Sequence, residues 1–128
     1  MQVALVEKQP GLFVVKLGKE YNFATIIYPK GNVSRFVQIG EGAIIYPGVI
    51  LTVNTKIGNH VIISGNCGIG HDTAIGDYSS VLWGSNFSGY DIVEERCFIG
   101  IGTKVIQGID INKESKISAG ITVLEDVM

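Results

Sequence analysis

The chain of 128 residues is short of the residues on which several classes of protein depend. It holds two cysteines, two histidines and three prolines, and only 17% of its residues are charged. Two cysteines cannot build the disulfide framework of a small secreted domain. Two histidines fall short of the three that a zinc hydratase of the γ-carbonic anhydrase type needs, so the sequence predicts no metal. A net charge of −2 gives no general attraction to nucleic acid.

Long hydrophobic runs are also missing. The apolar stretches are too short to cross a bilayer, and the N-terminus lacks a basic region followed by a long apolar one. These features predict no membrane insertion and a cytoplasmic location.

What the chain does have is a repeat of six residues. Every sixth residue from Ile27 to Val123 is aliphatic, with Phe87 as the one exception. The residue four positions further on is usually small or β-branched, as at Ala43 and Thr73. An α-helix of period 3.6 cannot keep a six-residue stripe on one face. Short strands with two inward side chains, joined at corners by residues such as glycine, account for the pattern.

Three such hexads close a triangular coil, and stacked coils pair their backbones in parallel. The sequence therefore predicts an all-β parallel solenoid of nearly six coils over residues 24–128. We expect residues 1–23 to form a capping segment in which Val3–Val6 and Leu12–Val15 make a β-hairpin. An edge strand that reaches a neighbouring subunit, or the remnant of a larger domain, are the alternatives. The repeat is still in phase at Met128, which indicates a shortened protein, an excised domain or capping by a partner.

Three details of the repeat carry further expectations. Cys67 and Cys97 both take the small inward position but lie on different faces, so we expect two buried thiols without a disulfide. Asp91 takes an inward position normally held by Ser, Thr or Val. Because an unpaired buried carboxylate is costly, Asp91 must find backbone partners or Arg96, or else the coil bulges. His60 is expected to be an exposed corner residue.

The candidate for chemistry is His71, which follows the corner glycine Gly70 and should therefore project outward. An exposed imidazole can accept a proton near neutral pH. Asp72 comes next in the chain and could orient the ring or pair with it once charged.

Residues 62–77, followed by Ser88-Gly89 and by residues 97–100, resemble one branch of the hexapeptide-repeat acyltransferases. That branch holds the sialic acid O-acetyltransferases and the bacterial sugar-nucleotide N-acetyltransferases that acetylate 4-amino sugars. The start of the repeat, Ala24–Pro29, is similar as well. The resemblance covers residues 23–127 and implies that the solenoid is a left-handed parallel β-helix.

The resemblance also implies roles for particular residues. His71 would be the general base and Asp72 its support, and acetyl-CoA would donate the acetyl group. Gly89, one coil beyond His71, would bring its backbone N–H to the thioester end of the coenzyme, where a tetrahedral oxyanion needs a donor. Corner backbone groups around Ser88 and Gly100-Ile101-Gly102 would line the pantetheine path. These enzymes are trimers with sites between neighbouring prisms, so a homotrimer and a sugar or sugar-nucleotide acceptor are expected.

The sequence departs from that family in two ways. Family members usually carry an N-terminal α/β domain that holds the sugar nucleotide, and a C-terminal segment with Gly-x-Pro that helps to cover the coenzyme. Neither is present in these 128 residues. A non-catalytic structural or oligomerising β-helix is therefore the alternative to an acetyltransferase for bacterial surface-glycan synthesis. The outward threonine arrays of an ice-binding solenoid and the large catalytic domain of a nucleotidyltransferase are both missing.

Overall fold

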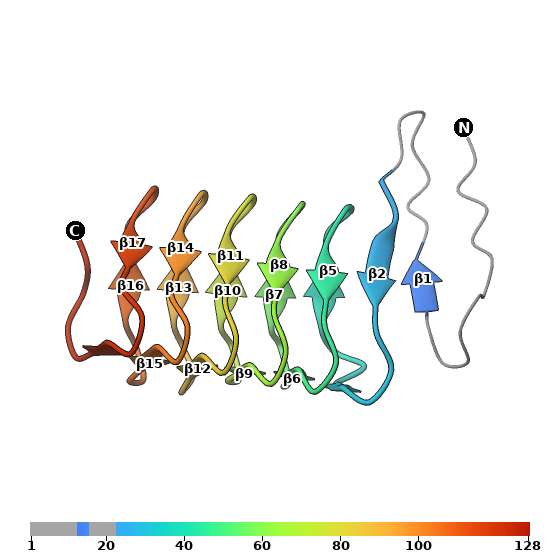
Figure 1. The fold of residues 1–128 in the computed structure, drawn as a ribbon, viewed down its shortest axis with the longest axis horizontal. Coiled ribbons are helices and arrows are strands. Elements are labelled where there is room, and N and C mark those ends of the chain that lie inside the picture. Colours follow the sequence, from blue (N-terminus) through green and yellow to red (C-terminus); the bar gives the residue numbers. More distant parts are fainter. Residues whose placement is uncertain (1–12, 16–22) are drawn as a thin grey trace.

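The computed structural model describes residues 13–15 and 23–128, which form a solenoid of short strands with between five and six turns (Figure 1). The described residues include no helix that could span a lipid bilayer. Three sheets run along the solenoid, and from β2 onward successive strands go to successive sheets. The first contains β1 (Phe13–Val15), β2 (Thr25–Ile27), β5 (Ile44–Ile45), β8 (Ile62–Ile63), β11 (Ser80–Val81), β14 (Phe98–Ile99) and β17 (Lys116–Ile117). The second contains β3 (Asn32–Val33), β6 (Ile50–Leu51), β9 (Gly68–Ile69), β12 (Asn86–Phe87), β15 (Lys104–Val105) and β18 (Thr122–Val123). The third contains β4 (Gln38–Ile39), β7 (Lys56–Ile57), β10 (Ala74–Ile75), β13 (Ile92–Val93) and β16 (Asp110–Ile111).

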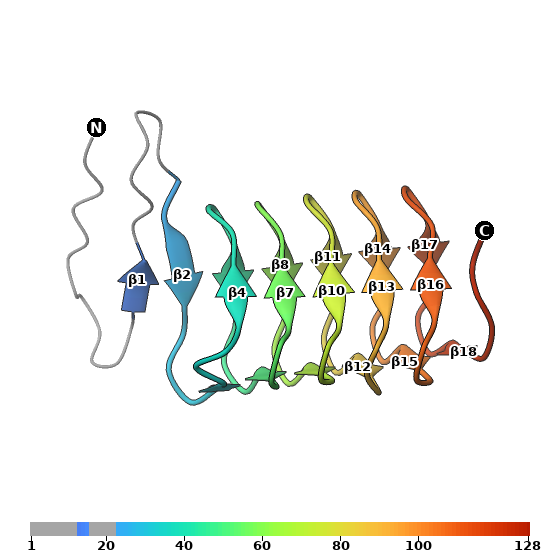
Figure 2. The same cartoon turned by 180° about the vertical axis from the view of Figure 1, so that it is seen from behind.

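From β2 onward, each strand pairs in parallel with the strand one coil away. In the third sheet, for example, Ala74 lies opposite Ile92 and Ile75 opposite Val93. The register is therefore eighteen residues, or three hexads, throughout the stack. Figure 2 shows the same stack from behind, with β4, β7, β10, β13 and β16 in order along it. The observed fold confirms the predicted all-β parallel β-helix.

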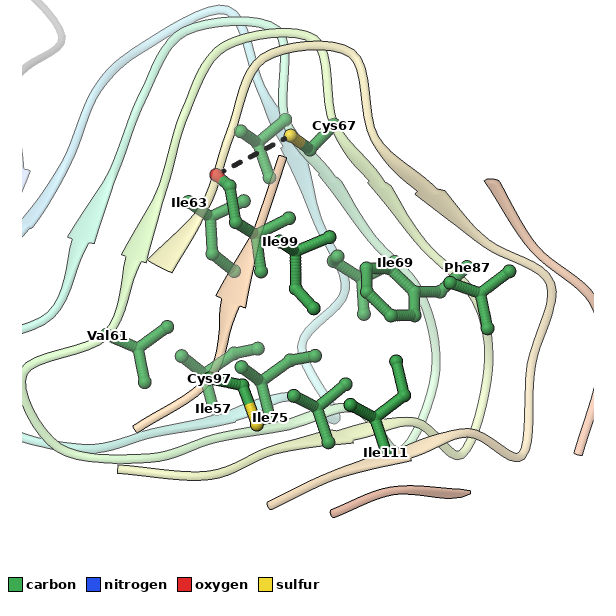
Figure 3. Close-up of a cluster of buried hydrophobic side chains, with 14 of the residues drawn as sticks. Ile57, Val61, Ile63, Cys67, Ile69, Ile75, Phe87, Cys97, Ile99 and Ile111 are labelled. Atoms are coloured by element: carbon green, nitrogen blue, oxygen red, sulfur yellow. Dashed lines mark hydrogen bonds between the residues drawn. The ribbon is translucent and has the colours of Figure 1, made fainter. Parts of the chain in front are cut away.

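The six-residue period arises because each two-residue strand turns only its second side chain into the prism. Ile63, Ile69 and Ile75 come from three different sheets, and all lie in the buried interior (Figure 3). The residue before most strands also points inward, and where it carries a hydroxyl this group commonly donates to a corner carbonyl. Ser79 Oγ, for example, donates to the Glu94 carbonyl at 3.0 Å. Buried polar groups thus find partners without interrupting the apolar core.

At most corners the second residue of the turn has a positive φ. Asn and Gly occupy many of these positions, such as Asn54 (φ 59°) and Gly48 (φ 77°), because they adopt this conformation at low cost. The first residue of the turn usually keeps a negative φ. This alternation decides which corner side chains project from the prism.

At the N-terminal end, β1 pairs antiparallel with β2, with Phe13 opposite Ile27 and Val15 opposite Thr25. The first proposed strand of the cap, Val3–Val6, lies outside the described residues, and the capping role stays a prediction. At the other end Val127 bridges to Ile111, so the chain continues in parallel beyond β18.

Both cysteines are free and buried, as predicted. Cys67 Sγ lies 3.0 Å from the Leu82 carbonyl oxygen, and Cys97 Sγ lies 3.2 Å from that of Asn112. Burial raises the pKa of both thiols, so they remain protonated core groups.

Candidate active site

His71 begins the corner that joins β9 to β10, and its side chain projects into solvent. The side chain is 42% exposed, and its Nδ1 lies 3.1 Å from Asp72 Oδ2. An ionised carboxylate can only accept, so this contact places the neutral ring's proton on Nδ1. Nε2 is then left with a free lone pair, which a general base requires.

Asp72 is itself held by a residue of the preceding coil. It occupies the second corner position with φ 57°, a conformation that aspartate tolerates better than most residues. Asn54, eighteen residues earlier, donates a hydrogen bond from Nδ2 to Asp72 Oδ1 at 3.2 Å. Asn54 thus fixes one carboxylate oxygen of Asp72, and the other oxygen contacts His71 Nδ1. Because the carboxylate is held in place, this second contact orients the imidazole.

Gly89 lies directly beside the free nitrogen of His71. A Cβ added at Gly89 would come within 2.8 Å of His71 Nε2, and the backbone there has φ 137°, which side chains rarely adopt. Tyr90 adds an edge-on ring contact with the imidazole, with centroids 4.9 Å apart, and its N–H donates to the His71 carbonyl at 2.9 Å. The lack of a side chain at Gly89 therefore keeps the space at Nε2 open.

The N–H of Gly89 does not point toward that space. It donates to Asp91 Oδ2 at 3.2 Å, inside the prism, while Oδ1 of the same carboxylate accepts from the Ile109 N–H at 2.9 Å. Of the alternatives expected for Asp91, the one in which its carboxylate finds backbone partners is therefore confirmed. Arg96 pairs with Glu95 and Glu114 instead.

Burial raises the pKa of the Asp91 carboxyl above the ordinary aspartate range. The backbone N–H groups that bond to it act in the opposite direction, and the nearby charge of Asp110 adds a smaller upward contribution.

The remaining residues of the expected coenzyme path lie at two different corners. Ser88 is exposed and precedes Gly89 in the turn next to His71. Gly100, Ile101 and Gly102 connect β14 to β15, a corner at the opposite edge of the sheet that contains β9. Ile101 is 54% exposed, and space around Gly102 is open. Within one chain the structure does not bring this corner to His71.

A hollow of about 440 Å³ opens beside Asp72 on the face of the third sheet. Ala74 is in its lining, and Phe36, Lys56 and Ile92 contribute larger side chains. The lining of the hollow thus contains a cationic and an aromatic side chain as well as Asp72, whose carboxylate orients His71.

His60 is less exposed than the sequence indicated. Its ring stacks on Tyr78, with centroids 5.2 Å apart and planes 15° from parallel, and the Phe23 ring packs edge-on at 4.8 Å. The prediction of a merely exposed corner histidine is therefore wrong, because an aromatic column shields the ring. No carboxylate accompanies this imidazole among its described contacts.

Sequence reasoning missed Asn54 and Tyr90 as parts of the site. Both occupy the same corner position as Asp72, one coil before and one coil after it, because 54, 72 and 90 differ by eighteen. Counting in steps of a full coil from Asp72 is the signal that could have found them.

A parallel β-helix of hexapeptide repeats with an oriented histidine at an exposed corner resembles the hexapeptide-repeat acyltransferases expected from the sequence. No protein-family model matches the chain. The chain is, however, similar to a sugar-nucleotide N-acetyltransferase. It is 36% identical over 96 residues to the GDP-perosamine N-acetyltransferase of Escherichia coli O157:H7, a match that covers 75% of this chain and 43% of that protein.

Two solved structures share this fold. A histidine-to-alanine mutant of GDP-perosamine N-acetyltransferase from Caulobacter crescentus, in complex with CoA and GDP-perosamine, superposes with a TM-score of 0.81. It is 29% identical, and the match covers 84% of this chain and 51% of that one. The acetyltransferase domain of PglB from Neisseria gonorrhoeae, in complex with acetyl coenzyme A, shares the fold with a TM-score of 0.81 at 20% identity over 84% of this chain and 53% of that one. The chain thus spans about half the length of the relatives it matches.

Proposed function

We propose that this chain is an acetyl-CoA-dependent N-acetyltransferase whose acceptor is the amino sugar of a sugar nucleotide. The observation that carries the proposal is the arrangement at His71, where Asp72 holds Nδ1 and leaves Nε2 free beside the open space at Gly89. The relatives named above supply the substrate class, since the Caulobacter protein was solved in complex with CoA and GDP-perosamine.

In the reaction, His71 Nε2 removes a proton from the acceptor amine as its nitrogen bonds to the thioester carbon. Asp72 stabilises the imidazolium that forms, because its carboxylate already accepts from Nδ1. The tetrahedral adduct collapses by breaking the carbon–sulfur bond, and the imidazolium returns the proton to the leaving thiolate. The products are an N-acetyl amide and free CoA, and His71 is regenerated.

The coenzyme end of the site is proposed to be shared between two copies. Ser88 and Gly89 lie next to His71, whereas Gly100, Ile101 and Gly102 lie at another corner of the same prism. They can serve one coenzyme only if a neighbouring copy presents that second corner to His71. A homotrimer of the kind expected from the family satisfies this condition.

The N–H of Gly89 is committed to Asp91 in this structure. We therefore assign to Gly89 the role of leaving room for the thioester, and not that of donating to the oxyanion.

The hollow beside Asp72 is a suitable place for part of the acceptor. Lys56 supplies a positive charge in its lining, and sugar nucleotides carry an anionic diphosphate. Lys56→Ala should therefore raise KM for the sugar nucleotide while leaving KM for acetyl-CoA unchanged.

The test measures acetyl-CoA binding by calorimetry and thiol release with a panel of amino-sugar nucleotides, each at pH 7.5. We expect binding and acceptor-dependent thiol release by the wild-type chain, in an assembly larger than a monomer by light scattering. If the wild-type chain ignores acetyl-CoA at millimolar concentration, the proposal is wrong and the structural, oligomerising solenoid is the better description.

A further inference from the structure

The turn that faces His71 differs from every other corner among the described residues. It is the one corner at which two successive residues, Gly89 (φ 137°) and Tyr90 (φ 52°), have positive φ. At the other corners with a positive φ, a single residue in the second corner position has it, between 54° and 80°, and at the Arg35-Phe36 corner neither residue does. Tyr78 also has a positive φ (60°) at an ordinary corner, so the distinguishing residue is Gly89. Because glycine can adopt many backbone conformations, a specific contact is needed to hold this turn in one of them.

Asp91 is placed to do so. Its side chain is fully buried, and its carboxylate bonds to two backbone N–H groups, those of Gly89 in the turn and Ile109 in the next coil. The Asp91 N–H lies 3.4 Å from Thr73 Oγ1 in the coil below. The residue therefore ties the turn to the coils on both sides of it.

The same turn forms the wall beside the His71 ring. The Gly89 backbone lies against Nε2, the Tyr90 ring meets the imidazole edge-on, and the Tyr90 N–H donates to the His71 carbonyl. A change in the conformation at Gly89 must therefore move groups that contact His71 directly.

We propose that Asp91 is a positioning residue, which sets the conformation of the Gly89-Tyr90 turn and through it the orientation of His71 and the space at Nε2. The Asp91 carboxylate captures the Gly89 N–H inside the prism, and this selects the backbone conformation that only glycine adopts readily. The inference concerns the same site as the proposed acetyl transfer and rests on it for its catalytic consequence.

The solenoid itself does not require a carboxylate at this position. Val49 and Val61 occupy the equivalent inward position before β6 and β8, and both are fully buried. Valine at this position removes the desolvation cost of a buried carboxylate, and this gain offsets the loss of the acceptor for the Gly89 and Ile109 N–H groups. A positioning role and a purely structural role therefore predict different results for Asp91→Val.

The experiment compares wild-type protein with Asp91→Val and Ser79→Ala by nitrogen-15 NMR of the full chain without coenzyme. Ser79 is the matched control, because it is equally buried, donates to the Glu94 carbonyl and accepts from the Cys97 N–H at a different corner. In Asp91→Val we expect an unchanged or higher Tm, exchange of the Gly89 amide at least about tenfold faster, and a shifted His71 Hε1 resonance. Ser79→Ala should lower the Tm and change neither NMR signal.

Equal protection of the Gly89 amide and an unmoved His71 resonance in Asp91→Val would overturn the proposal. So would a Tm loss in Asp91→Val as large as in Ser79→Ala together with an unmoved His71 resonance. If Asp91→Val does not fold, Asp91→Asn is measured instead. Its single amide oxygen cannot accept in the manner of two carboxylate oxygens, and the same shift of the His71 resonance is expected.

A kinetic readout separates this proposal from the proposed function. Where the wild-type chain transfers acetyl groups, Asp91→Val should lower kcat about tenfold or more through misplacement of His71, with a smaller change in KM for acetyl-CoA. Where the wild-type chain transfers none, the proposed function fails, and the NMR comparison still decides the role of Asp91.

Discussion

The two histidines of this chain lie at two different corners of the prism, and the structure gives them different surroundings. His71 takes the first position of its turn, where the next residue, Asp72, binds Nδ1 and Gly89 leaves Nε2 open. His60 takes the second position, with φ 54°, and its ring lies in a column between Phe23 and Tyr78. One imidazole keeps a ring nitrogen open, as the proposed proton transfer requires, and the other contributes packing. Position within the turn, and the residue one coil away, decide the difference.

The largest expected effect comes from removing the first imidazole. His71→Ala should lower acetyl transfer by about 10²–10⁴-fold, because the proposed general base is lost, while acetyl-CoA still binds. Thiol-release kinetics together with calorimetry measure both quantities. A variant that keeps more than half of the wild-type rate would show that the two histidines do not differ in the way proposed.

The second effect is at the glycine that distinguishes the His71 corner. Gly89→Ala places a methyl group within 2.8 Å of Nε2 at a φ of 137°, so we expect a loss of transfer of about 10²-fold and of stability by about 1–3 kcal/mol. Gly84→Ala is the control, because its φ is 70° and nothing lies within 4 Å of the added Cβ. Equal losses of rate in the two variants would contradict the role given to Gly89.

The third effect tests the carboxylate that His60 lacks. Asp72→Asn replaces the charged acceptor at Nδ1, and a hydrogen bond to a charged group contributes about 1.5–3 kcal/mol. Transfer should therefore fall by about ten- to a hundredfold. Asp77→Asn, at the corner between β10 and β11, changes a carboxylate that accepts from the Asn59 N–H at 2.8 Å and should leave kcat unchanged. A fall of the same size in both variants would argue against a specific role for Asp72.

A smaller effect concerns the pH dependence of stability beneath the His71 corner. Burial raises the pKa of Asp91 in the folded chain, so the folded state binds this proton more tightly than the unfolded state. The stabilisation is therefore complete below the unfolded-state pKa, and it is lost as the pH rises through the raised, folded-state pKa. Relative to wild type, Asp91→Val should gain stability as the pH rises from about 4 toward neutrality. Thermal unfolding of both proteins across this range measures the difference, and a constant difference would contradict the expectation.

The smallest effect is expected at the second histidine. His60→Phe keeps an aromatic ring between Phe23 and Tyr78, so stability should change by less than about 1 kcal/mol, and the transfer rate should match that of the wild-type chain. Denaturant unfolding and thiol release measure the two properties. A loss of activity in this variant would give His60 a role that its packing does not indicate.

Much of the fold was readable from the sequence because the repeat is local. A two-residue strand with one inward aliphatic side chain recurs every six residues from Ile27 to Val123, and the parallel register of eighteen follows from three such hexads. The burial of the Cys67 and Cys97 thiols follows from the same six-residue spacing, because both take the inward position before a strand. The outward placement of His71 follows as well, because it comes after a strand and its glycine.

The rest depended on contacts between coils, which a single hexad does not contain. The Asn54–Asp72 hydrogen bond, the Tyr90–His71 ring contact and the stacking of His60 on Tyr78 each join residues eighteen or nineteen positions apart. The direction of the Gly89 N–H could not be predicted from its neighbours in the repeat, because it depends on which group competes for it. A buried carboxylate is a stronger acceptor than a backbone carbonyl, so Asp91 captures this N–H.

By itself, the sequence determined the solenoid, its register and the corner at which His71 projects, since these follow from a short period of apolar and small residues. Only the tertiary structure decided which groups meet at that corner, because rotamers and backbone conformations depend on the coils above and below. It also showed that Gly100, Ile101 and Gly102 lie at a different corner from His71. The physical reason is that a prism has three corners, and residues share one only when their separation is close to a multiple of eighteen.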